Sequence, residues 1–174
     1  MIPSLDSLTD RGVQPPRLTT RIRRTLRRAI KFVALPTEDR VVLARAYVAL
    51  GQVDLSLRRL GFRRLVEQVG TGEVIASDRV TDGDVQRARV YARWIEVASR
   101  HHVIQAHCLH RSLALHQWLR LEHLPSQLRI GVRREGTGIS AHAWVELGGE
   151  VVNDQAPVVA RFAQLSTDRI ERWT

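Results

Sequence analysis

Apolar residues in the first hundred positions recur at helical spacing, and no stretch of that region alternates with period two. The spacing predicts helices over residues 19–33, about 38–59, 62–69 and about 81–100. In the first of these, apolar residues lie on one side and basic residues cover the rest. This basic helix either packs on its own domain or binds an acidic partner or a membrane surface.

Threonines and a glycine mark where these helices begin and end. Thr37 precedes two acidic residues, and Thr81 precedes Asp84 at capping-box spacing, so both threonines are predicted N-caps. Gly61 separates the second helix from the third. The helix over 38–59 is apolar around much of its circumference, which predicts a central position among the helices.

The pattern changes after residue 105. Apolar residues at helical spacing follow Cys108, and alternation with period two begins near Leu128. The predicted elements there are a strand over 128–132, a turn over 133–140, a hairpin over 141–154 and a short helix over 158–165. Helices followed by antiparallel strands indicate an α+β fold.

The same pattern predicts the domain organisation. Residues 1–18 contain three prolines and a glycine and form a flexible lead-in. Residues 19–100 form a helical N-terminal lobe, and residues 101–174 form a second lobe that carries the sheet. A chain of 174 residues with 44% apolar content can bury a core.

The amino-acid composition limits the classes of function that the chain can have. The net charge of +9 favours anionic partners, although an arginine-rich genome would produce the same bias. Nucleic-acid binding is not expected as the main function, because aromatic residues make up only 5% and no phosphate-binding glycine loop exists. No nucleotide or other cofactor motif is found. Without a signal peptide or an apolar run long enough to span a bilayer, we expect a cytoplasmic protein for which membrane association is unlikely.

Cys108 is the only cysteine, so it cannot form a disulfide within the chain. A free cysteine is often a small buried apolar residue. Here it begins a predicted helix, and the free N–H groups of a first turn favour a thiolate. These features make Cys108 a candidate nucleophile.

A candidate base and orienting group follow on the predicted hairpin. His142 alternates with small apolar residues on the first strand, and Asp154 ends the second. Thiol, imidazole and carboxylate form a nucleophilic triad when they meet. A two-residue Gly148-Gly149 loop would put His142 and Asp154 on opposite faces, so the chemistry predicts a three-residue loop or a bulge.

A metal site is the main alternative for the histidines near Cys108, namely His101, His102, His107, His110 and His116. Histidine and cysteine are good zinc ligands. However, the sequence has no Cys-x-x-Cys and no His-Glu-x-x-His spacing. No metal is therefore predicted.

Three segments resemble the B2 proteins of lasso peptide biosynthesis. They are Cys108-Leu109-x-Arg111-Ser112-Leu113-Ala114-Leu115, Ile130-Gly131-Val132 and Ala141-His142-Ala143-Trp144-Val145-Glu146. Those proteins are leader peptidases of the transglutaminase-like and papain-like thiol enzymes. The resemblance is strong from Gln105 to Asp154 and implies that residues 101–174 form a small transglutaminase-like catalytic lobe.

The resemblance also implies roles and partners. Cys108 would be the nucleophile, His142 the base and Asp154 the third member of a triad that cleaves the leader peptide through a thioester. Gln105 is a candidate oxyanion donor, although papain-like enzymes place their glutamine further upstream. A separate small leader-recognition protein of the B1 type and an asparagine-synthetase-like cyclase would be partners. Acyl transfer to an amine, or a non-catalytic scaffold that delivers a precursor to the cyclase, are the alternatives.

Overall fold

The computed structural model describes residues 35–69 and 80–165. The chain divides into two compact units, residues 1–40 and 41–174, and the second contains the sheet and most of the helical residues. The predicted lead-in over 1–18 and the basic helix over 19–33 lie outside the described residues. The lobe boundaries inferred from the sequence therefore stay predictions.

Three long helices precede the sheet, namely α2 (Thr37–Val69), α3 (Asp82–Ser99) and α4 (Cys108–Leu121). The predicted break at Gly61 is confirmed, because this residue has φ 76° and ψ 165° within α2. The predicted N-cap at Thr37 is wrong. The Pro36 carbonyl accepts the first hydrogen bond, from the N–H of Arg40, so Thr37 already lies in the first turn.

The start of α3 is a complete capping box, as predicted. The N–H of Asp84 donates to the Thr81 hydroxyl (3.2 Å), and the N–H of Thr81 donates to the Asp84 carboxylate (3.0 Å). The bonds from the backbone and hydroxyl of Thr81, followed by that from Arg87, lower the pKa of Asp84. These contacts fix the start of the helix that forms one wall of the site.

The central helix is α4, not α2. Only one side of α2 is buried, with Ala46, Leu50 and Val53 at helical spacing. Several other apolar residues lie on the exposed side: Val41 (62% exposed), Val48 (58%) and Leu55 (46%). In α4, by contrast, every residue from Ser112 to His116 is buried. The predicted central position of the second helix is therefore wrong, because apolar content does not specify which sides are covered.

The sheet consists of four antiparallel strands, β1 (Ser126–Glu135), β2 (Gly138–Leu147), β3 (Glu150–Val151) and β4 (Ala163–Gln164), in the order β3-β2-β1-β4. The predicted α+β fold is confirmed. The first strand and the hairpin are longer than predicted, because β1 and β2 pair as far as Glu135 and Gly138. The predicted turn over 133–140 is only two residues long, since polar residues here occupy an exposed part of the ladder.

The C-terminal part of the sheet differs from the prediction as well. A short helix, α5 (Ala156–Val159), precedes β4, where a helix over 158–165 was predicted. Pro157 stands in the first turn of α5, where its missing N–H costs no hydrogen bond. Ala163 and Gln164 then pair with Val132 and Gly131 at the edge of the sheet.

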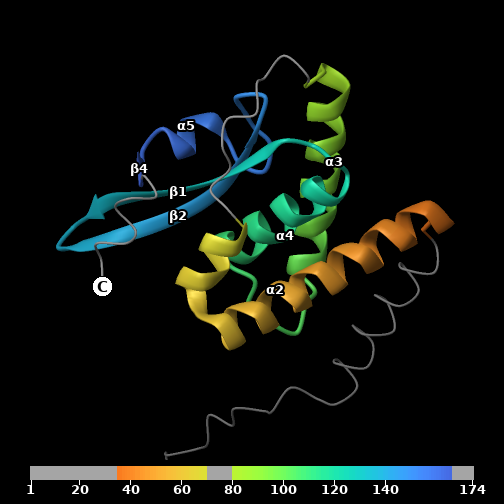
Figure 1. Cartoon of the computed structure of the whole chain (residues 1–174), viewed down its shortest axis with the longest axis horizontal. Coiled ribbons are helices and arrows are strands. Elements are labelled where there is room, and N and C mark those ends of the chain that lie inside the picture. Colours follow the sequence, from red (N-terminus) through yellow and green to blue (C-terminus); the bar gives the residue numbers. More distant parts are fainter. Residues whose placement is uncertain (1–34, 70–79, 166–174) are drawn as a thin grey trace, which may run out of the picture. The chain divides into compact units, whose positions relative to one another are not determined.

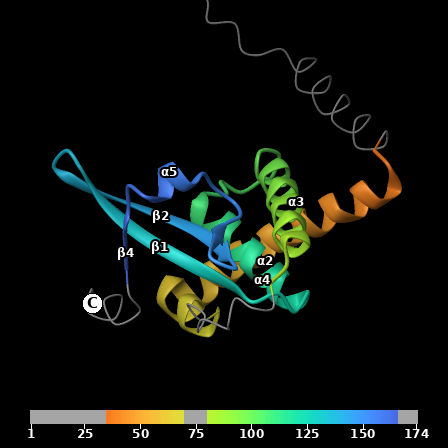
Figure 2. The same ribbon diagram turned by 90° about the horizontal axis from the view of Figure 1, so that it is seen from above.

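Within residues 41–165, α4 packs against one face of the β1–β2 hairpin (Figures 1 and 2). Leu113 and Leu119 of α4 share one buried cluster with Leu128 and Val145 of the sheet, and α3 contributes Ile95 to it. This packing sets the start of α4 beside β2 and α3. In the described part of the chain, no helix is sufficiently long and apolar to cross a membrane.

Candidate functional site

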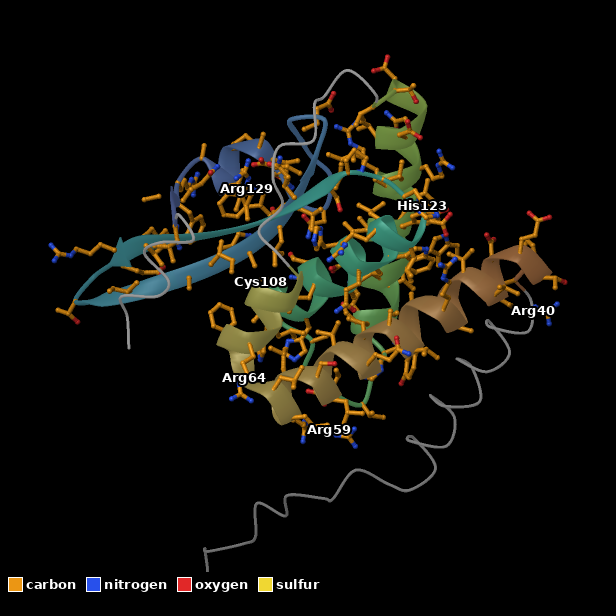
Figure 3. All side chains as sticks on the ribbon, in the orientation of Figure 1. Arg40, Arg59, Arg64, Cys108, His123 and Arg129 are labelled. Atoms are coloured by element: carbon orange, nitrogen blue, oxygen red, sulfur yellow. The ribbon has the colours of Figure 1, made fainter. Side chains whose placement is uncertain are left out.

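Cys108 lies in the first turn of α4, as its pattern predicts (Figure 3). His107 is the N-cap residue, and its side chain makes no capping hydrogen bond. The thiol is free and partly exposed. First-turn N–H groups have no acceptor within their own helix, so they can stabilise negative charge that forms beside Cys108.

His142 and Asp154 are in contact. Nε2 of His142 lies 2.6 Å from Oδ2 of Asp154, and their side chains are 17% and 23% exposed. The other carboxylate oxygen accepts a hydrogen bond of 2.7 Å from the N–H of Gln155. With Asp154 ionised, Nε2 carries the proton of a neutral imidazole, which leaves Nδ1 as the basic atom.

Two aromatic rings hold the imidazole of His142. Its centroid lies 5.0 Å from that of Phe162 and 6.2 Å from that of Trp144. Gly131 stands directly opposite His142 on β1. A Cβ at this glycine would come 2.8 Å from the Cβ of Phe162 and 2.9 Å from Trp144, so a side chain there would displace the two rings.

The loop before Asp154 differs from the prediction. Gly148 and Gly149 form a two-residue loop with φ of 60° and 83°, and Leu147 pairs with Glu150. The expected three-residue loop or bulge is therefore absent from this hairpin. The strand prediction assumed that pairing continues to Asp154, but β3 ends at Val151. The bends that follow carry Asp154 to the imidazole.

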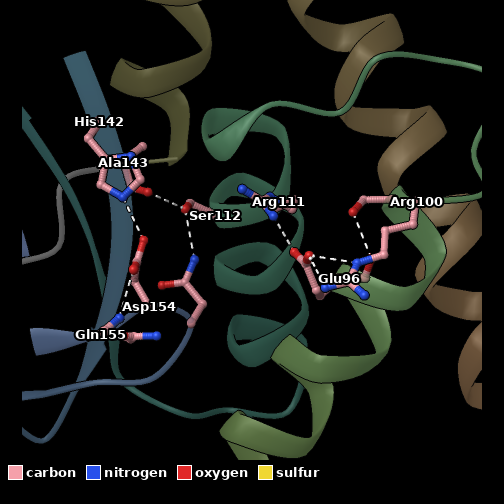
Figure 4. A network of polar contacts seen from close by, with 10 residues as sticks. Glu96, Arg100, Arg111, Ser112, His142, Ala143, Asp154 and Gln155 are labelled. Carbon is pink, nitrogen blue, oxygen red and sulfur yellow. Dashed lines mark hydrogen bonds and ion pairs between the residues drawn. The ribbon is translucent and has the colours of Figure 1, made fainter. Parts of the chain in front are cut away.

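Two polar residues that the sequence analysis did not single out join α4 to these bends. The hydroxyl of Ser112 donates a hydrogen bond to the Ala143 carbonyl (2.8 Å) and accepts one from the Asn153 amide (2.9 Å). Figure 4 shows both bonds of Ser112 as dashed lines. The Asn153 oxygen accepts from the N–H of Val145 (2.7 Å), in place of a strand bond. Ser112 is fully buried. The sequence feature that could have identified Ser112 is a serine within an otherwise apolar helical run.

This link sets the position of Cys108. Ser112 is four residues after Cys108, so both lie on one face of α4 a turn apart. Its partners, Ala143 and Asn153, immediately neighbour His142 and Asp154 in the sequence. The link therefore positions the start of α4 relative to the contact between the imidazole and the carboxylate.

A cavity of about 850 Å³ lies beside these residues. Cys108, Ser112 and Asp154 line it, together with the inner face of α3 and the segment 149–156. His142 reaches the cavity wall through its bond to Asp154. Of the three predicted triad members, the structure thus joins two directly and places the third on the same cavity.

Gln105 lies outside this arrangement of side chains. It is exposed, in the segment before α4, and does not belong to the cavity lining in the described part of the chain. Its proposed part as an oxyanion donor stays a prediction.

Other histidines near Cys108 have different surroundings. His110 faces α2, with Nε2 3.6 Å from Asp54, and its pKa is lowered, chiefly by burial, although the nearby carboxylate opposes this shift. His116 is buried and bonds to Ser126 (2.8 Å). Among the described residues, no three His, Cys, Asp or Glu side chains lie close enough together to hold a metal ion.

Replacing Ser112 with alanine should destabilise the fold. The change removes both bonds of this hydroxyl and leaves the Asn153 amide without its acceptor, at a cost of about 2 kcal/mol in the free energy of unfolding. Urea unfolding followed by circular dichroism measures this cost. Ser99→Ala is the matched control, because that hydroxyl bonds to the Glu96 carbonyl within its own helix. Equal losses in the two variants would contradict the proposed link.

Comparison with known proteins gives one match. A family model described as the transglutaminase-like superfamily matches residues 47–167, more than half of the chain. No curated protein matches significantly, and neither does any solved structure. The matched region includes α4, the whole sheet and all three candidate triad residues.

Proposed function

Because this chain belongs to the transglutaminase-like superfamily, we propose that it is a cysteine peptidase that removes the leader peptide from a ribosomally made lasso precursor. The superfamily includes thiol enzymes that hydrolyse amides or transfer acyl groups. The observation that carries the proposal is the bond between His142 and Asp154 beside the cavity that Cys108 lines. The sequence resemblance to lasso B2 proteins supplies the substrate class.

The proposed reaction has two halves, formation of a thioester on Cys108 and its hydrolysis, and His142 transfers a proton in each. Nδ1 of His142 accepts the thiol proton of Cys108 while Nε2–H donates to Asp154. The sulfur attacks the scissile carbonyl carbon, the C–N bond breaks, and the imidazolium protonates the leaving amine of the core peptide. Water then attacks the thioester, loses a proton to His142 and releases the leader with a free carboxylate.

The negative oxygen that forms during each attack needs donors. The backbone N–H of Cys108 begins α4 and has no acceptor within that helix, so it is the first proposed donor. We propose Gln105 as the second, because it lies three residues before the nucleophile. Substrate binding would have to bring its side chain to the cavity.

Leader recognition is proposed to come from a separate protein. In the described part of the first hundred residues the secondary structure is helical, so a leader could not add to a sheet edge there. A small B1-type protein would hold the leader, and an asparagine-synthetase-like cyclase would take the released core. The basic segment over 19–33 is a candidate contact for the first partner.

The test is cleavage of a full precursor with and without the recognition protein, in ¹⁸O-labelled water. Hydrolysis should place one ¹⁸O atom in the new carboxylate of the leader, measured by mass spectrometry. An acyl transferase would instead give an unlabelled amide with the added amine. Binding of the recognition protein should weaken with added salt if the basic segment contributes.

The possible results of this test lead to different conclusions about leader recognition and catalysis. Efficient cleavage by the chain alone would overturn the division of labour between two proteins. A partner requirement that is insensitive to salt would retain that division and remove the basic segment from it. Delivery of intact precursor to the cyclase without any cleavage would favour the scaffold function instead.

A further inference from the structure

The cavity beside Cys108 has one wall made mostly of arginine. On α3, Arg89, Arg93, Glu96 and Arg100 are spaced by four, three and four residues, so they form a single row along the helix. All four line the cavity, with Cys108 among the other lining residues. A basic row next to a candidate nucleophile favours a substrate that carries negative charge.

Most of these cations already have partners. Arg89 bonds to Glu150 across the cavity (2.6 Å). Arg100 bonds to one oxygen of Glu96 (3.1 Å), and Arg111 of α4 bonds to the other, as Figure 4 shows. A single carboxylate is therefore shared by two guanidinium groups, which leaves this part of the wall with excess positive charge.

Arg93 is the exception in the row. It lies between the two paired groups, is exposed, and has no acidic partner among the residues that the structure describes. The described lining contains four arginines against three carboxylates, which are Arg89, Arg93, Arg100 and Arg111 against Glu96, Glu150 and Asp154. Asp154, which bonds to His142, is one of these three carboxylates, and the lining still has one more arginine than carboxylates.

We propose that Arg93 binds a carboxylate of the peptide substrate, so that this enzyme prefers an acidic group near the scissile bond. The inference rests on the function proposed above and specifies its substrate. A guanidinium group can donate two parallel hydrogen bonds to a carboxylate, which makes arginine more selective than lysine for this group. The paired neighbours on either side hold the row in place and direct the acidic group to Arg93.

Two sources could supply the carboxylate, namely an Asp or Glu side chain or a peptide C-terminus. We would use synthetic peptides that span the scissile bond, each with Glu, Gln or Lys at one nearby position and an amidated C-terminus. A further peptide would carry Gln throughout and a free C-terminal carboxylate. The measured quantity is kcat/KM in the presence of the recognition protein.

For the wild type, Glu should exceed Gln at one position by about tenfold, the size expected for one charge-assisted hydrogen bond. Arg93→Gln should abolish this preference, and Arg93→Glu should reverse it in favour of Lys at that position. A preference for the free C-terminus over its amide would assign the terminal carboxylate instead. Arg134→Gln is the matched control, because it removes one exposed charge outside the cavity.

The inference is overturned if no position distinguishes Glu from Gln, or if the preference survives in Arg93→Gln. Failure of the proposed function has a different signature, since no peptide would then be cleaved in a Cys108-dependent way. In that case, fluorescence anisotropy of labelled Glu and Gln peptides on Cys108→Ala protein still measures whether Arg93 binds the carboxylate. Equal binding of the two peptides by that protein would also count against the inference.

Discussion

Cys108→Ala is expected to abolish leader removal while leaving the fold intact. The sulfur supplies the electron pair that forms the thioester, and alanine has no atom that can take its place. Loss of a nucleophile of this kind commonly costs on the order of 10⁴-fold or more in kcat. The residue is only partly buried, so the variant should unfold near the temperature of the wild type. Single-turnover cleavage and thermal unfolding measure the two effects.

Thiol labelling provides a control that does not depend on the substrate. Iodoacetamide should label the wild type at neutral pH, because the thiol of Cys108 is free and partly exposed. Cys108→Ala should not be labelled, since the chain has no other cysteine. Leader removal at wild-type rate by Cys108→Ala would end the cysteine-peptidase proposal.

The elements that carry the site could be predicted from short sequence patterns. The capping box at Thr81 and Asp84 involves residues three apart, and the position of Cys108 in a first turn follows from the apolar spacing after it. Such features depend on neighbouring residues alone, so no knowledge of the tertiary structure is needed. The α+β fold could be inferred for the same reason.

Features that depend on distant residues could not be predicted. The hydrogen bond between Ser112 and Asn153 joins positions 41 residues apart, and neither residue has a local pattern that specifies the other. The loop prediction was wrong because it extended β3 to Asp154, whereas the chain leaves the sheet after Val151. A side chain, that of Asn153, replaces the strand bond at this point.

From the sequence alone, Glu146 is a second candidate for the third member of the triad, because it lies on the same strand face as His142. In the structure its two oxygens accept hydrogen bonds of 2.9 Å from Trp144 and Arg129. Glu146 therefore anchors the neighbouring tryptophan, and it serves as the matched control for the carboxylate of Asp154.

His142→Ala should reduce cleavage as strongly as Cys108→Ala, whereas the loss of kcat in Asp154→Ala should be smaller by roughly ten- to a hundredfold. Without the imidazole no base accepts the thiol proton, but without Asp154 the ring keeps its contacts with Phe162 and Trp144 and loses only its orienting carboxylate.

Single-turnover rates at saturating precursor measure this order, and the double variant of His142 and Asp154 should be no slower than His142→Ala, because both residues act through one proton transfer. Glu146→Gln should retain most of the activity. If Asp154→Ala were as active as the wild type while Glu146→Gln were inactive, the carboxylate that orients His142 would be Glu146, and the contact of 2.6 Å between His142 and Asp154 would have no part in the reaction.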